Sequence, residues 1–179
     1  MPKYIAFLRA INVGGHTVKM DHLRTLFEAL GFSNVETFIA SGNVIFDSKS
    51  KNTRALEKKI EAFLQASLGY AVVTFIRSTD EVATIAGYEP FKVADPNGDR
   101  NVLYIAFLAD TPAEEAKKKL LSFATENDEL HVSGREVYWR SHKKMSESEF
   151  SGARLEKILG MPATLRNSTT IKRLGSKYP

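Results

Sequence analysis

The sequence contains no cysteine. This absence excludes disulfide bonds, thiolate nucleophiles, iron–sulfur clusters and cysteine–zinc sites, and it is typical of a chain that never meets an oxidising compartment. Long apolar runs are also missing. None approaches the roughly 20 residues that a membrane helix needs, and the N-terminal segment lacks the apolar core and the cleavage site of a signal peptide. We therefore expect a cytoplasmic protein with no membrane partner.

Patterns of metal ligands are absent as well. None of the histidines has the i, i+4 spacing or the carboxylate partners of a zinc site. They are His16, His22, His131 and His142. We expect no metal and no cofactor. An imidazole in a loop, such as that of His16, can still act as an acid or a base near neutral pH, although a polar loop histidine without such a role is the alternative.

Basic residues gather near the C-terminus. The net charge is only +4, and the chain is long enough for one domain or for two small ones of about 80 to 90 residues each. From Met161 to Pro179, however, there are four basic side chains and no acidic one. Such a segment can attract anions, phosphates included, whereas a solvated basic helix is the alternative interpretation.

The chain repeats three of its segments in the same order. YIAFL at 4–8 recurs letter for letter at 104–108. FIASGNVIF at 38–46 resembles LHVSGREVYW at 130–139, with Ser41 aligned to Ser133, and ALEKKI at 55–60 is echoed by RLEKIL at 154–159. A single short match can be chance, but the shared order of all three predicts an internal duplication.

Apolar periodicity and turn residues predict the same element order, β-α-β-β-α-β, in each half. In the first half we expect a strand at 4–9, a helix that ends at Gly31, hairpin strands at 35–39 and 43–47, a helix with apolar positions from Leu56 to Leu68, and a strand at 71–76. In the second half we expect a strand at 102–108, a helix that Thr111 caps, a hairpin around Ser133–Gly134, a helix at 152–160, a strand at 162–166 and a last helix from about Ser168.

This order predicts an α+β protein built from two ferredoxin-like β-α-β-β-α-β halves that pack together. The first half covers residues 1–77 and the second covers residues 102–179 with the C-terminal helix. Residues 78–101 connect them. This connection should begin with a capping box at Ser78–Glu81, which opens a short helix, and continue as a loop.

Two segments carry a family resemblance. LRAINVGGHTVKMDHLRTLFEALGFSNVETFIASGNVIF at 8–46 and LEKILGMPATLRNSTT at 155–170 resemble the bacterial family catalogued as domain of unknown function 1697. The resemblance covers essentially the whole chain. It implies a doubled ferredoxin-like fold and brings no activity with it. This chain has Ser168 where the family often has an aromatic residue after the Arg-Asn pair.

The loop after the first strand contains Arg9, Asn12, Gly14, Gly15 and His16. Its glycines can expose backbone N–H groups to an anion ahead of a helix, and an arginine at a strand end can bind a phosphate or carboxylate with two hydrogen bonds. The segment is not a Walker loop, since no Lys-Ser or Lys-Thr pair follows. A purely structural turn is the alternative.

Two further segments are candidate binding residues. Ser41, Gly42 and Asn43 form a hairpin turn that lacks the glycine spacing of a nucleophile elbow, so a structural turn is one interpretation and a binding site the other. Near the C-terminus, Arg166, Asn167 and Thr169 precede or open the last helix. There an oxyanion can meet a cation, side-chain donors and backbone N–H groups together, while a plain N-cap is the alternative.

Sheet geometry leads to a prediction about how these segments combine. We expect the loop after the first strand to lie at the opposite end of the sheet from the Ser41 turn and from the exit of the last strand. Within one half, loop and turn would then not meet. If the halves are related by a pseudo-twofold axis, Arg9 can instead approach Arg166 of the other half, which predicts an anion site between the halves.

Two classes of function fit this pattern. One is a binding protein for a phosphate-bearing or other anionic ligand, with nucleic acid or a nucleotide among the candidates. The alternative is a small metabolic enzyme that acts on a phosphorylated or carboxylated metabolite, in which Arg9 and Arg166 hold the anion and His16 is the acid or base. A structural or regulatory partner protein would leave no mark in the sequence, and the oligomeric state cannot be predicted from it.

Overall fold

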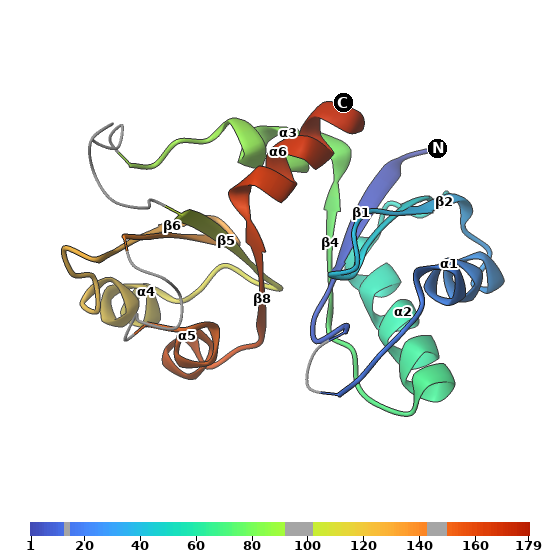
Figure 1. The fold of residues 1–179 in the computed structure, drawn as a ribbon, viewed down its shortest axis with the longest axis horizontal. Coiled ribbons are helices and arrows are strands. Elements are labelled where there is room, and N and C mark those ends of the chain that lie inside the picture. Colours follow the sequence, from blue (N-terminus) through green and yellow to red (C-terminus); the bar gives the residue numbers. More distant parts are fainter. Residues whose placement is uncertain (13–14, 92–101, 143–149) are drawn as a thin grey trace. The chain divides into compact units, whose positions relative to one another are not determined.

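The computed structural model describes residues 1–12, 15–91, 102–142 and 150–179, and Figure 1 shows the path of the chain. The elements of the first half are β1 (Lys3–Leu8), α1 (Met20–Ala29), β2 (Ser33–Thr37), β3 (Asn43–Asp47), α2 (Thr53–Leu68), β4 (Thr74–Ser78) and α3 (Thr79–Gly87). Those of the second half are β5 (Val102–Leu108), α4 (Glu114–Leu121), β6 (Asp128–Ser133), β7 (Glu136–Ser141), α5 (Gly152–Leu159), β8 (Ala163–Asn167) and α6 (Ser168–Lys177).

Each half forms a four-stranded antiparallel sheet. The strand order is β2-β3-β1-β4 in one sheet and β6-β7-β5-β8 in the other. Two helices cover one face of each sheet, α1 and α2 in the first and α4 and α5 in the second (Figure 1). This is the arrangement of the ferredoxin-like fold, and the predicted α+β class with two β-α-β-β-α-β halves is confirmed. The described chain divides into two compact units: the first unit is Met1–Ile85 with Leu174–Pro179, and the second unit is Ala86–Arg173.

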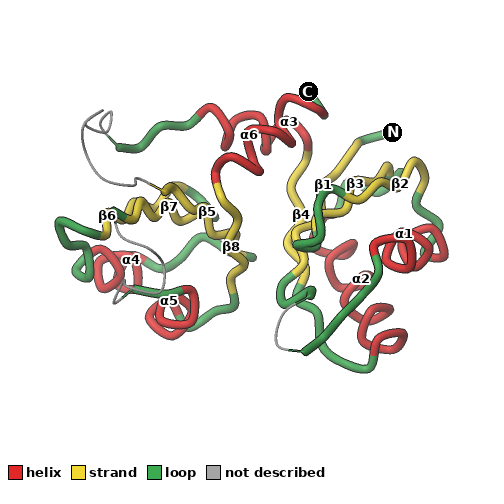
Figure 2. The backbone as a smooth tube through the Cα atoms, in the orientation of Figure 1, coloured by secondary structure: helices red, strands yellow, loops and turns green. Residues whose placement is uncertain are grey.

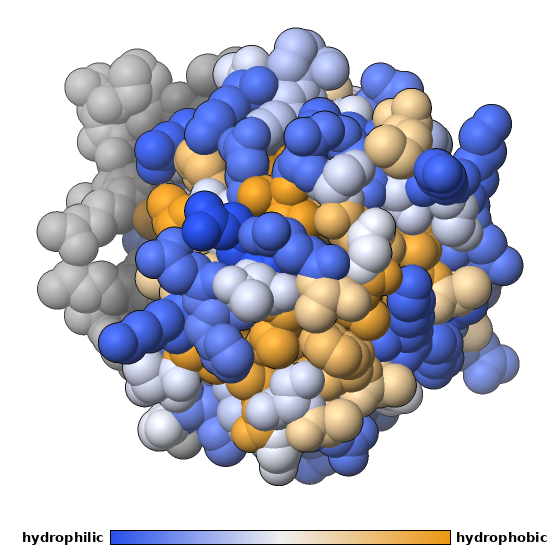
Figure 3. Space-filling model, turned by 90° about the vertical axis from the view of Figure 1, so that its right-hand side faces the viewer, coloured by the Kyte–Doolittle hydropathy of each residue, from blue (hydrophilic) through white to orange (hydrophobic). Residues whose placement is uncertain are grey.

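The core of the first unit follows from the alternation of side chains along β1. Tyr4, Ala6 and Leu8 lie on one face of the strand, where they pack with Phe27 of α1 and Ile60 of α2, and all five are at most 4% exposed. Burial of one such large apolar side chain contributes roughly 1.5–3 kcal/mol. On the side of the molecule that carries these helices, hydrophobic residues gather in the middle of the view and hydrophilic residues lie around them (Figure 3).

Capping residues set the limits of the helices. α2 begins after Asn52, whose Oδ1 accepts the N–H of Ala55 at 3.0 Å, and it ends at Gly69 with φ of +85°. α3 opens with the predicted capping box, which is confirmed. The N–H of Ser78 donates to Oε2 of Glu81 at 2.7 Å, and the N–H of Glu81 donates to Oγ of Ser78 at 3.1 Å.

The predicted boundaries of three elements are wrong. β4 covers Thr74–Ser78 rather than residues 71–76. α4 begins only at Glu114, and its N-cap is Ala113, which has no side-chain acceptor to offer. Thr111 lies two residues before this N-cap, so its hydroxyl is not at the position from which a side chain accepts the N–H groups of the first turn. β2 ends at Thr37 rather than at residue 39, since Ile39 has φ of +51°, which no strand accommodates. Residues 92–101 of the predicted connection lie outside the described residues.

The strand registers show that the predicted alignment of Ser41 with Ser133 is wrong by one residue. Phe7 of β1 pairs with Asn43, and the equivalent Phe107 of β5 pairs with Glu136. The two halves therefore match here at an offset of 93, one more than the alignment of Ser41 with Ser133 assumed. The structural counterpart of Ser41 is therefore Gly134, and the second unit has no serine at the position equivalent to Ser41.

In the second unit the core is built around a single indole. Trp139 of β7 is 1% exposed, and its Nε1–H donates to Oδ1 of Asp128 at 2.8 Å. Its ring packs against Tyr104 and against the edge of Phe150, each at 5.0 Å between ring centroids. The hydrogen bond satisfies the one polar atom of the indole, so the ring is buried without an unpaired donor.

An ion pair on this sheet gives a prediction about pH. Oε2 of Glu129 accepts a hydrogen bond from Nε of Arg140 at 2.5 Å and lies 3.0 Å from Nε2 of His142. The bond from Arg140 is the main reason that the pKa of Glu129 is lowered. A lowered folded-state pKa stabilises the protein above the unfolded value, and this contribution is lost as the pH falls through the folded-state pKa.

Glu129→Gln is therefore expected to lower the free energy of unfolding at pH 7 by about 0.5–1 kcal/mol, a modest loss because screening weakens a half-exposed pair. The variant and the unmodified protein should become equally stable only when the pH has fallen below the folded-state pKa of Glu129, which lies below the usual value for a glutamate. Urea denaturation at several pH values measures this. Glu126→Gln, at an exposed glutamate on the preceding turn, should change nothing, and a pH-independent loss in Glu129→Gln would contradict the prediction.

Candidate functional site

Three connections of the first unit meet at one edge of its sheet. β1 is antiparallel to β3 and β4, so the end of β1 lies beside the start of each of them. The N–H of Leu8 donates to the carbonyl of Gly42 and the N–H of Arg9 to the carbonyl of Val73, both at 2.9 Å. We call the β1–α1, β2–β3 and α2–β4 connections together the loop edge, and Figure 2 shows them as the loops at the ends of β1 and α2.

The prediction that the Arg9–His16 loop and the Ser41 turn lie at opposite ends of the sheet is wrong. Nδ2 of Asn12 donates to the carbonyl of Ala40 at 2.8 Å, which joins the loop directly to the turn. The physical reason is strand direction, since an antiparallel neighbour begins where β1 ends. The exit of β4 does lie at the other end, because Ser78 pairs with Tyr4.

Asn12 holds the β1–α1 loop in shape. Its Oδ1 accepts the N–H of Val18 at 2.7 Å, while its Nδ2 bonds to Ala40. Its own φ is +58°, a conformation that asparagine tolerates better than most residues. Both the oxygen and the nitrogen of the side-chain amide therefore bond to other residues of the protein, and these bonds let Asn12 position the loop.

The Ser41–Asn43 turn is equally constrained. Asn43 is fully buried, and its Nδ2 donates to the carbonyl of Phe38 at 2.9 Å and to Oγ of Ser41 at 3.0 Å. Gly42 has φ of +86°, and a Cβ atom there would lie 3.0 Å from Cβ of Ile11. Only glycine fits this position, because the backbone of the turn is pressed against the end of β1.

Backbone strain is concentrated at the loop edge. Four non-glycine residues with positive φ occur in the described part of the chain, and three of them lie here: Ala10 at +63°, Asn12 at +58° and Ile39 at +51°. Each costs roughly 1–3 kcal/mol and persists only when the surrounding structure enforces it. Such residues cluster at binding and active sites. Ile39 is also 44% exposed, which is unusual for a large apolar side chain.

The imidazole of His16 packs against an aromatic ring. Its ring stacks on Tyr70 of the α2–β4 connection with 3.8 Å between centroids and 26° between planes. The hydroxyl oxygen of Tyr70 is buried and has no hydrogen-bond partner among the described residues. Gly15, with φ of +85°, is exposed and has open space around it. Gly14 lies outside the described residues.

The C-terminal candidates lie in the second unit. Arg166 on β8 is 7% exposed, and its Nη1 donates to Oγ1 of Thr164 at 2.7 Å and to the carbonyl of Leu165 at 2.9 Å. Burial lowers the pKa of Arg166 to about 10. Oδ1 of Asn167 accepts the N–H of Thr169 at 2.9 Å, the geometry of a side-chain cap on α6.

Arg166 has a structural counterpart in the first unit. Arg77 on β4 pairs with Ile5 just as Arg166 on β8 pairs with Ile105. The Nη1 of Arg77 also donates to the carbonyl of the preceding residue, Ile76, at 3.0 Å. The next-to-last residue of each strand is thus a buried arginine, and a helix follows the strand directly. An arrangement present in both halves is a feature of the fold, whereas the loop edge with its long β1–α1 connection is particular to the first unit.

Sequence reasoning missed Tyr70, Ala10 and Ile39. No motif marks these residues, but the antiparallel pairing of β1 with β4 places the segment before β4 at the same edge as the β1–α1 loop, and this would have pointed to Tyr70. The described residues include no group of three or more histidine, cysteine, aspartate or glutamate side chains that could hold a metal ion. None of the described helices is both long enough and apolar enough to cross a membrane.

Two sheets of the same strand order, each with a helix pair on one face, define the protein as a member of the α+β class with two ferredoxin-like units. The chain belongs to the family described as "Protein of unknown function (DUF1697)", whose model matches residues 1–138. It is also similar to a solved structure, the conserved bacterial protein SP0830 from Streptococcus pneumoniae, with a TM-score of 0.77, 22% identity and coverage of 99% of this chain and 98% of that one. This likeness concerns the fold. No curated protein matches.

Proposed function

We propose that the loop edge of the first unit binds the phosphate or carboxylate group of a small anionic ligand. The observation that carries this proposal is the hydrogen bond from Asn12 to Ala40, which brings the Arg9–His16 loop and the Ser41 turn to one place. The strained backbone at Ala10 and Ile39 supports it, because such strain is maintained at sites that need fixed geometry.

The residues of this edge supply the donors that an oxyanion needs. Arg9 carries a charged guanidinium, a group that can bind an oxyanion with two hydrogen bonds, while the exposed Gly15 brings a backbone N–H and Ser41 a hydroxyl. His16 adds a ring nitrogen, and its stack on Tyr70 fixes where that nitrogen lies. Asn12 and Asn43 act differently from the sequence-based interpretation, since their amides bond within the protein and position the donors.

A difference in loop length between the two halves also supports a binding site at the loop edge. The connection from β1 to α1 covers residues 9–19, whereas the equivalent connection from β5 to α4 covers only residues 109–113. A loop that must only join a strand to a helix can be short. The extra length of the first loop, with its arginine, glycines and histidine, is therefore the segment most suited to a ligand. The participation of Arg166, Asn167 and Thr169 stays a prediction.

Arg9→Gln is expected to weaken binding of a phosphate-bearing ligand by about tenfold or more, because a charge-assisted bidentate contact is lost. Thermal shift with inorganic phosphate, a nucleoside monophosphate, a sugar phosphate and an oligonucleotide identifies the ligand, and calorimetry then compares the variants. Arg9→Lys, which keeps the charge, should bind with intermediate affinity. Arg24→Gln, on the outer face of α1, should bind like the unmodified protein.

Two outcomes would contradict the proposal: no compound raises the melting temperature, or Arg9→Gln binds as tightly as the unmodified protein. An oligonucleotide that alone binds, with strong salt dependence, would place the ligand among nucleic acids. A small enzyme with His16 as acid or base is the second candidate, favoured by the ring stack on Tyr70. A bound metabolite that is chemically altered on incubation, as mass spectrometry would show, favours the enzyme.

A further inference from the structure

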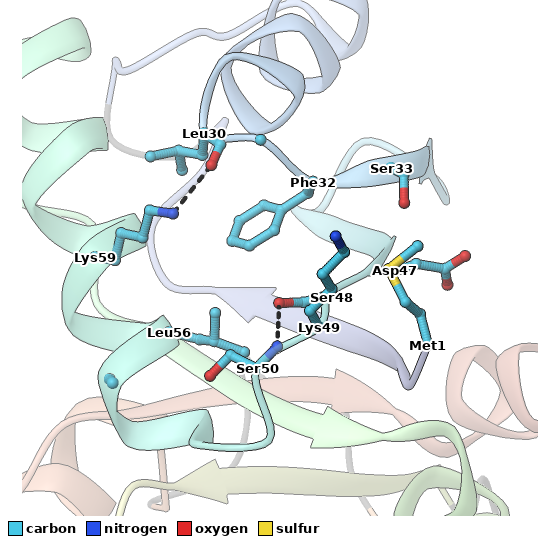
Figure 4. Close-up of a pocket in the computed structure, with 12 residues that line it drawn as sticks. Met1, Leu30, Phe32, Ser33, Asp47, Ser48, Lys49, Ser50, Leu56 and Lys59 are labelled. Atoms are coloured by element: carbon cyan, nitrogen blue, oxygen red, sulfur yellow. Dashed lines mark hydrogen bonds between the residues drawn. The ribbon is translucent and has the colours of Figure 1, made fainter.

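A cavity of about 540 Å³ opens at the other end of the same sheet, where β3 ends and α2 begins (Figure 4). We call it the β3–α2 cavity. It is remote from the loop edge along β1, because Asp47 at the cavity pairs with Lys3, whereas Asn43 at the loop edge pairs with Phe7. Its volume falls in the range of about 300–1,000 Å³ that is typical of small-molecule sites.

The floor of the cavity is apolar. Phe32 and Leu56 line it, and they are 7% and 4% exposed. Phe32 is held in place from behind by Phe46, with 4.5 Å between ring centroids. A fixed aromatic ring beside an aliphatic side chain is a surface on which a flat apolar group can pack.

The cavity carries a positive charge. Asp47 is its one acidic lining residue, and that carboxylate is already paired with Nζ of Lys3 at 2.9 Å and with Nδ2 of Asn34 at 2.8 Å. Burial opposes ionisation of Asp47, but these hydrogen bonds outweigh burial and leave its pKa lowered. Lys49 and Lys59 also line the cavity, so two ammonium groups are not balanced by a carboxylate there.

Lys59 is oriented by two contacts. Its Nζ donates to the carbonyl of Leu30 at 3.0 Å and lies 5.3 Å from the centroid of the Phe32 ring. In the view of Figure 4 the ring of Phe32 stands between the ends of Lys59 and Lys49. An ammonium has three donors, so Lys59 keeps donors for a further acceptor. The cation and the aromatic floor are therefore presented together.

Hydroxyl groups complete the wall. Oγ of Ser48 accepts the N–H of Ser50, and Oγ of Ser50 accepts the N–H of Asn52, each at 3.2 Å. Because both oxygens accept, their hydroxyl hydrogens are oriented away from these backbone groups and can donate to a ligand. The wall thus offers donors and the floor offers apolar surface.

We propose that the β3–α2 cavity binds a small aromatic molecule that carries one carboxylate or phosphate group. The ring of the ligand packs on Phe32 and Leu56, and its anionic group bonds to one of the two ammonium groups that flank Phe32, that of Lys49 or that of Lys59. This site is separate from the loop edge, and neither depends on the other.

Titration of the full chain with phenyl phosphate and with benzoate tests the proposal, with binding followed by calorimetry and by amide chemical shifts. At least one of them should bind and shift the amides of Ser48, Lys49 and Ser50, whereas inorganic phosphate or phenol alone should bind at least tenfold more weakly. Comparison of the two probes shows whether the site prefers a phosphate or a carboxylate. Joint replacement, Lys49→Met with Lys59→Met, keeps the apolar stems and should weaken binding at least tenfold.

Arg9→Gln is the control that separates the two sites: whatever it changes at the loop edge, it should leave the ligand-induced shifts of the Ser48, Lys49 and Ser50 amides unchanged. Three results would overturn the proposal: neither probe binds up to about 10 mM, the double lysine variant binds as well as the unmodified protein, or the shifted amides are those of Ser41 and Gly42. The last result would place the probe at the loop edge and so support the proposed function there.

Discussion

Replacing Gly42 with alanine is expected to lower the free energy of unfolding by about 2–4 kcal/mol. Two causes add. Alanine is strained at φ of +86°, and its Cβ would lie 3.0 Å from Cβ of Ile11 and 3.2 Å from Cβ of Leu8. Both neighbours are buried and fixed by the end of β1, so neither can move away cheaply. Urea denaturation followed by far-ultraviolet circular dichroism measures the loss.

Gly15→Ala is the matched control for this change. Gly15 has nearly the same φ, +85°, but no atom lies within 4 Å of the added Cβ. It should therefore cost only the conformational strain, about 1 kcal/mol. Equal losses in the two variants would show that Ile11 and Leu8 yield to the new methyl group, contrary to the rigid contact between turn and strand.

Asn43→Asp is expected to destabilise the protein by about 3 kcal/mol or more at pH 7, because it places a buried carboxylate against a carbonyl oxygen. In the native protein Nδ2 of Asn43 donates to the carbonyl of Phe38 and to Oγ of Ser41. An aspartate can donate there only when it is protonated. Its folded-state pKa will thus lie above the unfolded value, so the variant is most stable below the unfolded pKa and loses stability as the pH rises through the folded-state pKa.

Measurement of denaturation midpoints between about pH 4 and pH 8 tests this sign. The deficit of Asn43→Asp should be smallest at the acidic end. Asn127→Asp, at a half-buried residue on the turn before β6, should show a small difference that hardly changes with pH. A deficit in Asn43→Asp that is constant over the range, or that grows as the pH falls, would contradict the role assigned to the buried amide.

Most of the fold was predictable because its signals are local. The alternation of YIAFL, the helical spacing from Leu56 to Leu68 and the Ser78–Glu81 capping box each act within a few residues of the chain, and each predicted its element. The errors at Thr111 and Ile39 have another source. Whether a helix starts two residues later, or a strand stops two residues earlier, depends on backbone angles that the neighbouring structure imposes.

The candidate site was predictable only in part. Arg9, Gly15, His16 and Ser41 were singled out by residue type. That the β1–α1 loop lies beside the Ser41 turn depends on the antiparallel pairing of β1 with β3, whereas the sequence-based prediction placed loop and turn at opposite ends of the sheet. The bond from Asn12 to Ala40 spans 28 residues, and no local pattern encodes it. The equivalence of Arg77 and Arg166 was hidden for a similar reason, since it emerges from strand register rather than from similarity of letters.

The buried indole of Trp139 has a practical consequence for every measurement of stability on this chain. It is the protein's single tryptophan and lies in the second unit, so tryptophan emission follows the loss of that unit alone, while circular dichroism averages over the helices and strands of both. If a substitution at Gly42 or Asn43 destabilises only the first unit, the denaturation curve followed by tryptophan emission will not change, and only the curve followed by circular dichroism will shift. Coincidence of the two curves would mean that the halves melt as one cooperative body.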